Sequence, residues 1–210
     1  MNNRVVVVLV CILVLIVLSG CSSTPQQQTT SATPQPVEKK EAVLYTGKPC
    51  FTRMVDQARR WSLDAMPVHV ESELNSESLG HDGKATVWQA TFVSPSRATA
   101  RVYSCSGSLL ADAPPQGISA RPEMAASTAV PMFDPSFLGT DSDAAFAVAQ
   151  EKGGAKLLEK DPKQPVIYAL NWDPQKKQLV WIVVYGTDPK DSKGMGVIDA
   201  STGKFLRASK

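Results

Sequence analysis

Two neighbouring segments near the C-terminus decide the fold: VWIVVYG at residues 180–186 and GMGVIDASTGKFL at residues 194–206. The first is rich in β-branched and aromatic residues, and both are apolar runs bounded by turn signals, as buried strands are. The sequence STG at 201–203 is a turn signal that sends the chain back on itself. We therefore predict antiparallel strands over 179–186 and 194–200, followed by a short returning strand.

A helix and another strand are predicted before these two segments. Thr140–Asp143 supply helix-capping residues, and a mostly apolar stretch follows over 145–149. Gly153 and Gly154 predict the end of this helix. An apolar run over 166–172 then predicts a strand. We expect residues 139–210 to form one helix packed on three or four antiparallel strands.

The first half of the chain has the same order of predicted elements. Helical spacing on one face is shown by five apolar residues: Phe51, Met54, Val55, Ala58 and Trp61. Pro67 ends any helix, and alternating patterns predict strands over 67–74, 85–93 and 99–105. Residues 47–112 are therefore expected to form a first unit. A stretch rich in proline and small residues, 113–138, is predicted to connect the two units.

The two halves share short words at matching positions. Pro67-Val68 and Val87-Trp88 match Pro165-Val166 and Val180-Trp181, at separations in the nineties. Each match is weak alone, but their common order indicates an internal duplication. We therefore predict an α+β protein of two repeated units, each with one helix on a three- to four-stranded antiparallel sheet. The sequence leaves open whether the units share one sheet.

The helix, the strand VWIVVYG and the sequence Asp-Ala-x-x-Gly at 199–203 resemble the PepSY-type module of secreted and envelope bacterial proteins. The resemblance covers residues 141–207 best. Residues 50–111 resemble a degenerate copy, with Ser104-Cys105 in place of Asp199-Ala200. The resemblance implies a cystatin-like α+β module that inhibits peptidases or binds proteins locally. It implies no catalytic residues.

The first 20 residues resemble the signal peptide of a bacterial lipoprotein. Arg4 is basic, and the apolar run Val5–Leu18 is shorter than the roughly 20 residues that span a membrane. Leu18-Ser19-Gly20-Cys21 resembles a lipobox, which implies cleavage before Cys21 and diacylation of its thiol. The alternatives are an ordinary cleaved signal and an uncleaved anchor.

Residues 21–46 are predicted to be a disordered tether. The sequence SSTPQQQTTSATPQPVEKKE, at 22–41, lacks the apolar residues needed to bury a core. Such a tether holds a folded head away from the membrane surface. The residue after Cys21 is Ser22 and not Asp, and in this respect the chain resembles lipoproteins that are exported to the outer membrane. We therefore expect the periplasmic face of the outer membrane in a cell with two membranes.

Charge argues against nucleic-acid binding. The chain has 22 basic and 20 acidic residues, and removal of Arg4 leaves 21 and 20, a net charge of +1. The basic residues are interspersed with acids, whereas nucleic-acid-binding proteins cluster them. The expected partners are the membrane, through the lipid, and an envelope protein or peptide.

Two cysteines remain once Cys11 leaves with the signal and Cys21 takes lipid. Exported chains meet oxidising conditions, so we predict a disulfide between Cys50 and Cys105. The alternatives are two free thiols or a metal site. Zinc sites need closely spaced donors, and His69 and His81 are distant from both cysteines in sequence.

No catalytic signature is found. His69 alternates with Glu71 and Glu73, and this pattern suits the exposed face of a strand better than a metal site. Asp188 and Asp191 favour a solvated turn over a calcium site. Trp88 and Trp181 lie in apolar strands and are predicted to pack in a core. A nucleophile elbow, a phosphate-binding loop and a dinucleotide fingerprint are absent.

We therefore expect no enzyme, no cofactor and no metal. The favoured function is a lipid-anchored envelope protein that binds a protein or peptide without catalysis, inhibiting or regulating a peptidase. Unpaired edge strands are one physical route to peptide capture. The alternative is a structural or assembly subunit of an envelope complex.

Overall fold

The computed structural model describes residues 40–209, so the predicted signal peptide, Cys21 and most of the predicted tether lie outside the described residues. The helical elements are α1 (Gly47–Trp61), α2 (Ser142–Ala149), α3 (Ala155–Lys160), the kinked turn η3 (Gln150–Gly154) between α2 and α3, and two short 3₁₀ turns, η1 (His81–Gly83) and η2 (Pro135–Phe137). The strands are β1 (Tyr45–Thr46), β2 (Met66–Glu73), β3 (Lys84–Ala85), β4 (Val87–Ser94), β5 (Thr99–Ser106), β6 (Gly117–Ala120), β7 (Met124–Ala125), β8 (Val166–Asp173), β9 (Gln178–Tyr185), β10 (Gly194–Asp199) and β11 (Phe205–Ser209).

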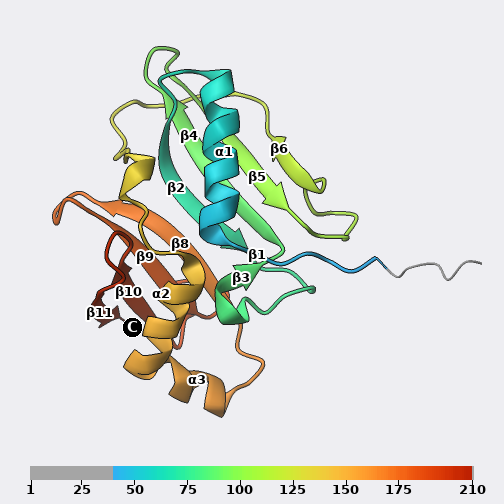
Figure 1. Cartoon of the computed structure of the whole chain (residues 1–210), viewed down its shortest axis with the longest axis vertical. Coiled ribbons are helices and arrows are strands. Elements are labelled where there is room, and N and C mark those ends of the chain that lie inside the picture. The colour runs from blue at the N-terminus through green and yellow to red at the C-terminus, as the bar shows by residue number, and fades with distance from the viewer. Residues whose placement is uncertain (1–39, 210) are drawn as a thin grey trace, which may run out of the picture. The chain divides into compact units, whose positions relative to one another are not determined.

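One antiparallel sheet of nine strands organises the described chain (Figure 1). Its order is β11-β10-β9-β8-β2-β4-β5-β6, and β7 pairs with β5. The two halves of the chain meet where β2 pairs with β8, with Val70 opposite Leu170. The predicted α+β class with antiparallel strands is confirmed, and the two halves share a single sheet.

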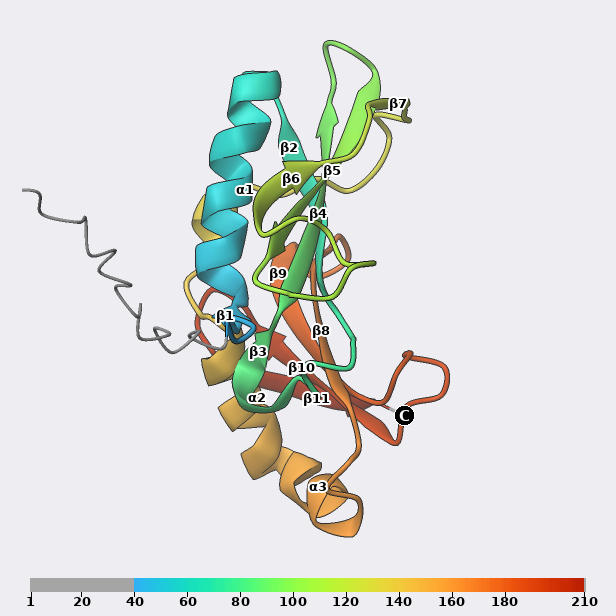
Figure 2. The same ribbon diagram turned by 90° about the vertical axis from the view of Figure 1, so that its right-hand side faces the viewer.

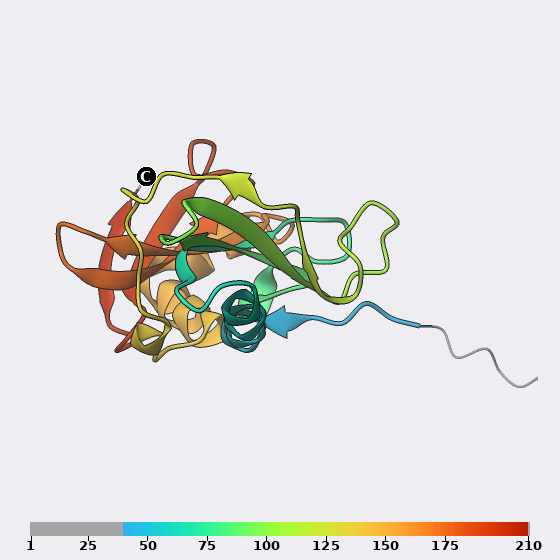
Figure 3. The same cartoon turned by 90° about the horizontal axis from the view of Figure 1, so that it is seen from above.

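The long helix α1 and the shorter α2 cover one face of this sheet, and no helix of residues 40–209 covers the other face (Figure 2). Figure 3, viewed along α1, shows the same arrangement. The helix α1 forms because its apolar residues recur at helical spacing, so that Phe51, Met54 and Ala58 are buried against the strands. The hydrophobic core therefore lies in one layer between the helices and the sheet.

The centre of the core is a pair of tryptophans, one from each half of the chain. Trp88 on β4 and Trp181 on β9 are both 0% exposed, and their rings meet edge to face with centroids 6.0 Å apart. Each indole N–H donates to a backbone carbonyl just before a helix, Trp88 to Tyr45 at 2.8 Å and Trp181 to Thr140 at 2.9 Å. The predicted core positions of both tryptophans are confirmed.

The N-termini of α1 and α2 share one carboxylate. Asp141 accepts hydrogen bonds from the backbone N–H of Lys48 in α1 and of Ser142 in α2, both at 2.7 Å. Its second oxygen accepts from the hydroxyl of Thr46, also at 2.7 Å. A carboxylate at a helix N-terminus satisfies free N–H groups and interacts favourably with the helix dipole. Asp141 therefore ties the two helices together.

Two segments differ from the sequence-based expectations. Residues 45–46, placed in the tether, form β1 because β3 supplies a pairing partner. The stretch 113–138, predicted as a connector, contains β6 and β7, which extend the sheet beyond β5. The predicted end of the second helix near Gly153 is confirmed, because Lys152 and Gly153 have non-helical backbone angles, and the chain then begins the short helix α3. Within the described residues, no helix has the length and apolarity to span a membrane.

Candidate functional site

The structure places His69 and Glu71 on the sheet face that carries no helix. His69 Nε2 lies 3.1 Å from Glu71, and its Nδ1 lies 2.6 Å from the amide oxygen of Asn171 on β8. The hydrogen bond with Glu71 raises the pKa of His69 and lowers the pKa of Glu71. His81 lies elsewhere, with its Nε2 3.0 Å from the carbonyl of Gln164. This geometry is an ion pair at the seam between β2 and β8.

A metal site is not assembled in the described part of the chain, where no group of three His, Cys, Asp or Glu side chains converges. Asp188 accepts from the backbone N–H of Lys190 at 2.6 Å, as in a short polar turn. Cys50 on α1 and Cys105 on β5 are buried and joined by a disulfide, with Cα atoms 5.6 Å apart. Cys21 lies outside the described residues.

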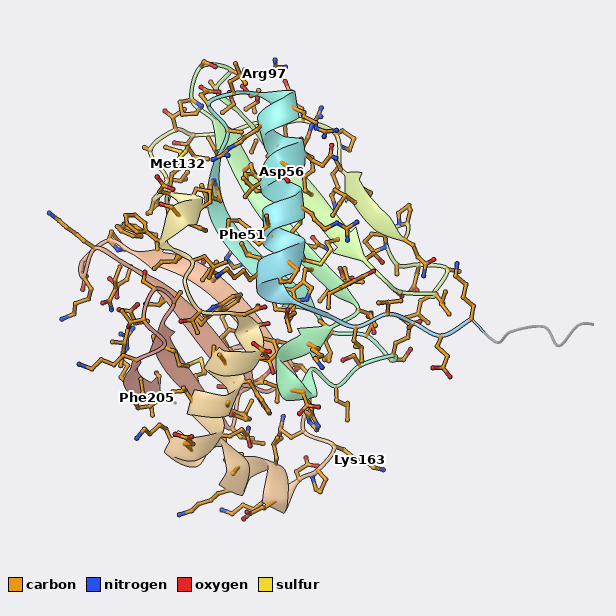
Figure 4. All side chains as sticks on the ribbon, in the orientation of Figure 1. Phe51, Asp56, Arg97, Met132, Lys163 and Phe205 are labelled. Atoms are coloured by element: carbon orange, nitrogen blue, oxygen red, sulfur yellow. A yellow bond between two sulfur atoms is a disulfide. The ribbon has the colours of Figure 1, made fainter. Side chains whose placement is uncertain are left out.

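The other two tryptophans lie nearer the surface and are held by neighbours. Trp61, at the end of α1, donates its indole N–H to Glu123 at 2.6 Å. The guanidinium groups of Arg97 and Arg101 lie over its ring, 5.8 and 5.3 Å from the centroid (Arg97 is labelled in Figure 4). Trp172 stacks on Phe137 with centroids 5.6 Å apart. The four tryptophans therefore do not form one ligand-stacking surface.

A different site appears at the free end of the sheet. A cavity of about 200 Å³ lies between η3, α3 and the strands β10 and β11. We call it the β11 groove; its lining residues are Ala149, Lys152, Gly153, Gly154, Leu157, Tyr185, Lys193, Gly194, Met195, Gly196, Phe205, Ala208 and Ser209. Figure 4 labels Phe205 at this end of the molecule. The volume is smaller than the roughly 300–1,000 Å³ of most small-molecule sites, so it suits a peptide side chain better than a large cofactor.

Glycine shapes the walls of the β11 groove. Gly153 has φ of 119°, which L-residues with side chains rarely adopt, and this conformation lets the chain turn through η3. A Cβ on Gly154 would lie 1.8 Å from the hydroxyl of Tyr185. Here the turn brings Tyr185 directly against the backbone of the groove.

Tyr185 presents a buried hydroxyl beside this turn. The residue is 2% exposed, and its hydroxyl accepts a hydrogen bond from the side-chain amide of Gln150 at 2.8 Å. No acceptor for its own proton is found among residues 40–209. Burial raises the pKa of Tyr185 to about 12, so the hydroxyl keeps its proton at neutral pH. Tyr185 therefore has a hydrogen bond to donate.

The charge of the β11 groove is positive. Lys152 and Lys193 line it, and none of the described lining residues is acidic. Neither lysine forms an ion pair within residues 40–209. Their ammonium groups remain available to a carboxylate or another anion.

The strand beside the groove is the end of the sheet. β11 pairs with β10 through Gly196–Ala208 and Val197–Arg207, and no strand of residues 40–209 pairs with its outer side. The opposite end, β6, has four residues and is flanked by Pro114, Pro115 and Pro122. Proline lacks a backbone N–H and blocks strand addition. β11 contains no proline, so its outer edge is the better template for an added strand.

A second cavity, of about 260 Å³, lies along α1. Its floor is apolar, from Phe51, Val55 and Leu138, with Lys48 and Arg59 also lining it. Lys48 already donates to the carbonyl of Gly139 at 2.9 Å. This cavity also lacks a free strand edge, so it is the weaker candidate.

Sequence reasoning missed the β11 groove. Gly153-Gly154 indicates a helix end, and Gly194-Met195-Gly196 indicates a relaxed strand, when each is considered alone. Only the fold brings these two pairs of glycines into one cavity. The available signal was a concentration of glycine in two segments that the predicted fold makes neighbours.

Comparison with known proteins supports the fold. No protein-family model and no curated protein matches the chain. A solved structure of a protein from Clostridium difficile 630, provisionally described as a lipoprotein, matches with a TM-score of 0.52 and 11% sequence identity. The match covers 78% of this chain and 93% of that one. At this identity the likeness shows a shared fold.

Proposed function

We propose that this protein is a lipid-anchored, non-catalytic binding protein of the bacterial cell envelope that captures an extended peptide or protein segment. One observation carries this proposal: a proline-free edge strand, β11, borders a small apolar groove with two basic residues. An exposed edge supplies backbone hydrogen bonds, and adjacent pockets supply side-chain selectivity. Inhibition or regulation of a peptidase by such capture agrees with the PepSY resemblance.

Affinity capture tests this function. Residues 22–210 are attached to a support through the N-terminus, and bound envelope proteins are identified by mass spectrometry. Enrichment of one secreted or periplasmic protein, bound with one-to-one stoichiometry by the purified chain, is the expected result. A bare support and a heat-denatured sample of the same chain serve as controls. Failure to enrich any protein above these controls would count against the proposal.

We also propose that the two halves are tandem PepSY-like units. Two similarities support this: a helical segment precedes the sheet strands in each half, five strands in the first and four in the second, and each half has an indole N–H bonded to a backbone carbonyl just before its helix. The first strands of the halves, β2 and β8, pair at the middle of the sheet. Structures of relatives whose chain contains a single unit would test the duplication.

Lipid anchoring through Cys21 is part of the same proposal, and the sequence Leu18-Ser19-Gly20-Cys21 supports it. Two acyl chains suffice for stable anchoring because each buried CH₂ contributes about 0.8 kcal/mol. We expect Cys21→Ala to give an unprocessed precursor or a soluble form, measured by membrane fractionation and intact mass. A processed form that stays on the membrane would refute lipidation. The outer membrane is the proposed destination in a cell with two membranes.

A structural or assembly subunit is the second candidate. Ile167 on β8 and Ile182 on β9 lie on the sheet face without helices and are partly exposed, and apolar side chains at such a position suit a protein contact. Size-exclusion chromatography of gently solubilised membranes tests it. Recovery only in one fixed large assembly favours this function, whereas a free pool that binds a substrate favours the first.

A further inference from the structure

We infer that the β11 groove binds an extended peptide that pairs with the outer edge of β11 and places a carboxylate beside Lys152 and Lys193. This inference rests on the proposed function and specifies its ligand. The carboxylate belongs either to the peptide's C-terminus or to an acidic side chain. The inference requires three features to lie together, and each is taken in turn.

The backbone of β11 determines the form of the ligand. A strand at the end of a sheet has a row of N–H and C=O groups that an added strand satisfies, and this pairing requires an extended peptide. β11 has five residues, Phe205–Ser209, with no proline and no partner on its outer side within the described residues. Several consecutive backbone pairs are therefore available.

The groove determines which side chains the ligand carries. Side chains of an added strand alternate between the two faces of the sheet, so every second one points to the helix side. Phe205 pairs with Ile198 of β10, and Ala208 pairs with Gly196. Phe205 and Ala208 both line the β11 groove, together with Leu157 of α3. A cavity of about 200 Å³ with apolar walls accepts a small or medium apolar side chain.

The charged and polar groups determine the anion. Lys152 and Lys193 line the groove without an acidic lining residue, so a carboxylate meets positive charge only. Tyr185 is 2% exposed, and its hydroxyl proton has no acceptor within residues 40–209. A carboxylate in the groove would lie beside both lysines and Tyr185, and charge-assisted hydrogen bonds are the stronger kind. A neutral peptide leaves these donors unused.

The test uses residues 22–210 and fluorescent heptapeptide pools built from Val, Thr, Ala and Ser. One pool ends in a free carboxylate, a second in an amide, and a third in an amide with one internal glutamate. Binding is measured by fluorescence anisotropy. We expect saturable binding of the free-acid pool or the glutamate pool, at least about tenfold tighter than the neutral amide pool. The preferred pool identifies the source of the carboxylate.

Variants separate the groove from other surfaces. Lys152→Glu/Lys193→Glu should weaken binding of the preferred pool at least about tenfold, and Tyr185→Phe should weaken it less. Lys176→Glu/Lys177→Glu, with the same charge change in the β8–β9 turn, is the control and should bind as the unchanged protein does. N-methylation of alternate peptide amides should abolish binding because it removes the N–H groups that pair with β11.

Four results would overturn the inference: equal binding of acid and neutral pools, equal weakening by both double variants, unchanged binding after N-methylation, or binding of octanoate without binding of any pool. A failure of this inference can be distinguished from a failure of the proposed function. If affinity capture retains its partner on Lys152→Glu/Lys193→Glu while no pool binds, the protein is a binding protein that uses another surface.

Discussion

At the scale of single residues, His69 and Glu71 make the seam between β2 and β8 sensitive to pH. The raised pKa of His69 means that its contribution is complete below the unfolded value of 6.5 and is lost as pH rises through the folded value. The lowered pKa of Glu71 means that its contribution is present above 4.5 and is lost as pH falls through its folded value. Both contributions are present together between these two values.

We therefore expect His69→Gln to lower the free energy of unfolding most between about pH 4.5 and 6.5, and less at pH 8.5. The side chains of His69 and Glu71 are 34% and 54% exposed, so the loss should stay below about 1 kcal/mol. Urea unfolding across this pH range measures it. The double variant His69→Gln/Glu71→Gln should remove the pH dependence, and a loss that grows above pH 8 would contradict the assignment.

The residues of β2 also show which features of the structure a sequence pattern can predict. The alternation of Val68 and Val70 with His69 and Glu71 indicates two faces of a strand, and the structure places His69 and Glu71 on the face without helices. That His69 would contact Asn171 could not be predicted, because the pairing of β2 with β8 joins residues 102 apart in sequence. Sequence periodicity gives the face of a residue, whereas its neighbour across the sheet depends on the tertiary fold.

At the scale of elements, Asp141 links two helices, and its removal should affect both. Asp141→Ala leaves the N–H groups of Lys48 and Ser142 without their acceptor. Loss of one N-cap costs about 1 kcal/mol, so we expect a loss of roughly 2 kcal/mol in unfolding free energy. Asp141→Asn keeps one acceptor oxygen and should cost less than half of that.

Urea unfolding followed by far-UV circular dichroism measures the effect of the Asp141 variants. Asp191→Asn is the control for charge, because Asp191 is exposed in the loop between β9 and β10. If Asp141→Ala and Asp191→Asn were equally stable, the shared cap would contribute nothing. A loss by Asp141→Asn as large as that by Asp141→Ala would instead assign the effect to charge at the helix N-termini.

The disulfide joins the helix layer to the sheet. Cys50 lies on α1 and Cys105 on β5, 55 residues apart in sequence, and both are buried. Closing a loop of this length stabilises the folded state by about 4 kcal/mol in the chain-entropy model. We expect Cys50→Ala/Cys105→Ala to lose 2–4 kcal/mol, roughly, in urea unfolding. Unchanged stability of this variant, with one cooperative transition, would contradict the expectation.

The elements also differ in how well they could be predicted. Strands β8, β9 and β10 carry long apolar runs, so the predicted ranges 166–172, 179–186 and 194–200 lie within a residue of the observed ends. β6 has the sequence GISA inside a proline-rich stretch and carries too few apolar residues to indicate a strand. β6 forms because β5 supplies a pairing partner, and its own sequence does not indicate a strand. The β11 groove depends on this same level of structure.

At the scale of the described chain, the two halves are joined by surfaces that neither half completes alone. Trp88 and Trp181 bury each other, and β2 pairs with β8. Asp141 from the second half caps α1 of the first. Each half, if separated from the other, would expose one large aromatic ring and one strand edge. Burial of such a ring, together with its aromatic contacts, stabilises a fold by several kcal/mol. We infer that the halves fold as one cooperative unit.

A fragment tests this inference. We expect residues 22–210 to unfold in urea in one transition, with tryptophan fluorescence and far-UV circular dichroism coinciding. Residues 139–210 alone should lack a cooperative transition and show a weak near-UV circular dichroism signal. The reason is that Trp181 loses its contact with Trp88, and β8 loses its pairing with β2. Trp88→Phe in residues 22–210 is the matched control, since it keeps the seam while weakening the aromatic contact. A fragment 139–210 that unfolds as sharply as residues 22–210 would show that the halves are independent, and peptide binding would then have to be measured on each half separately.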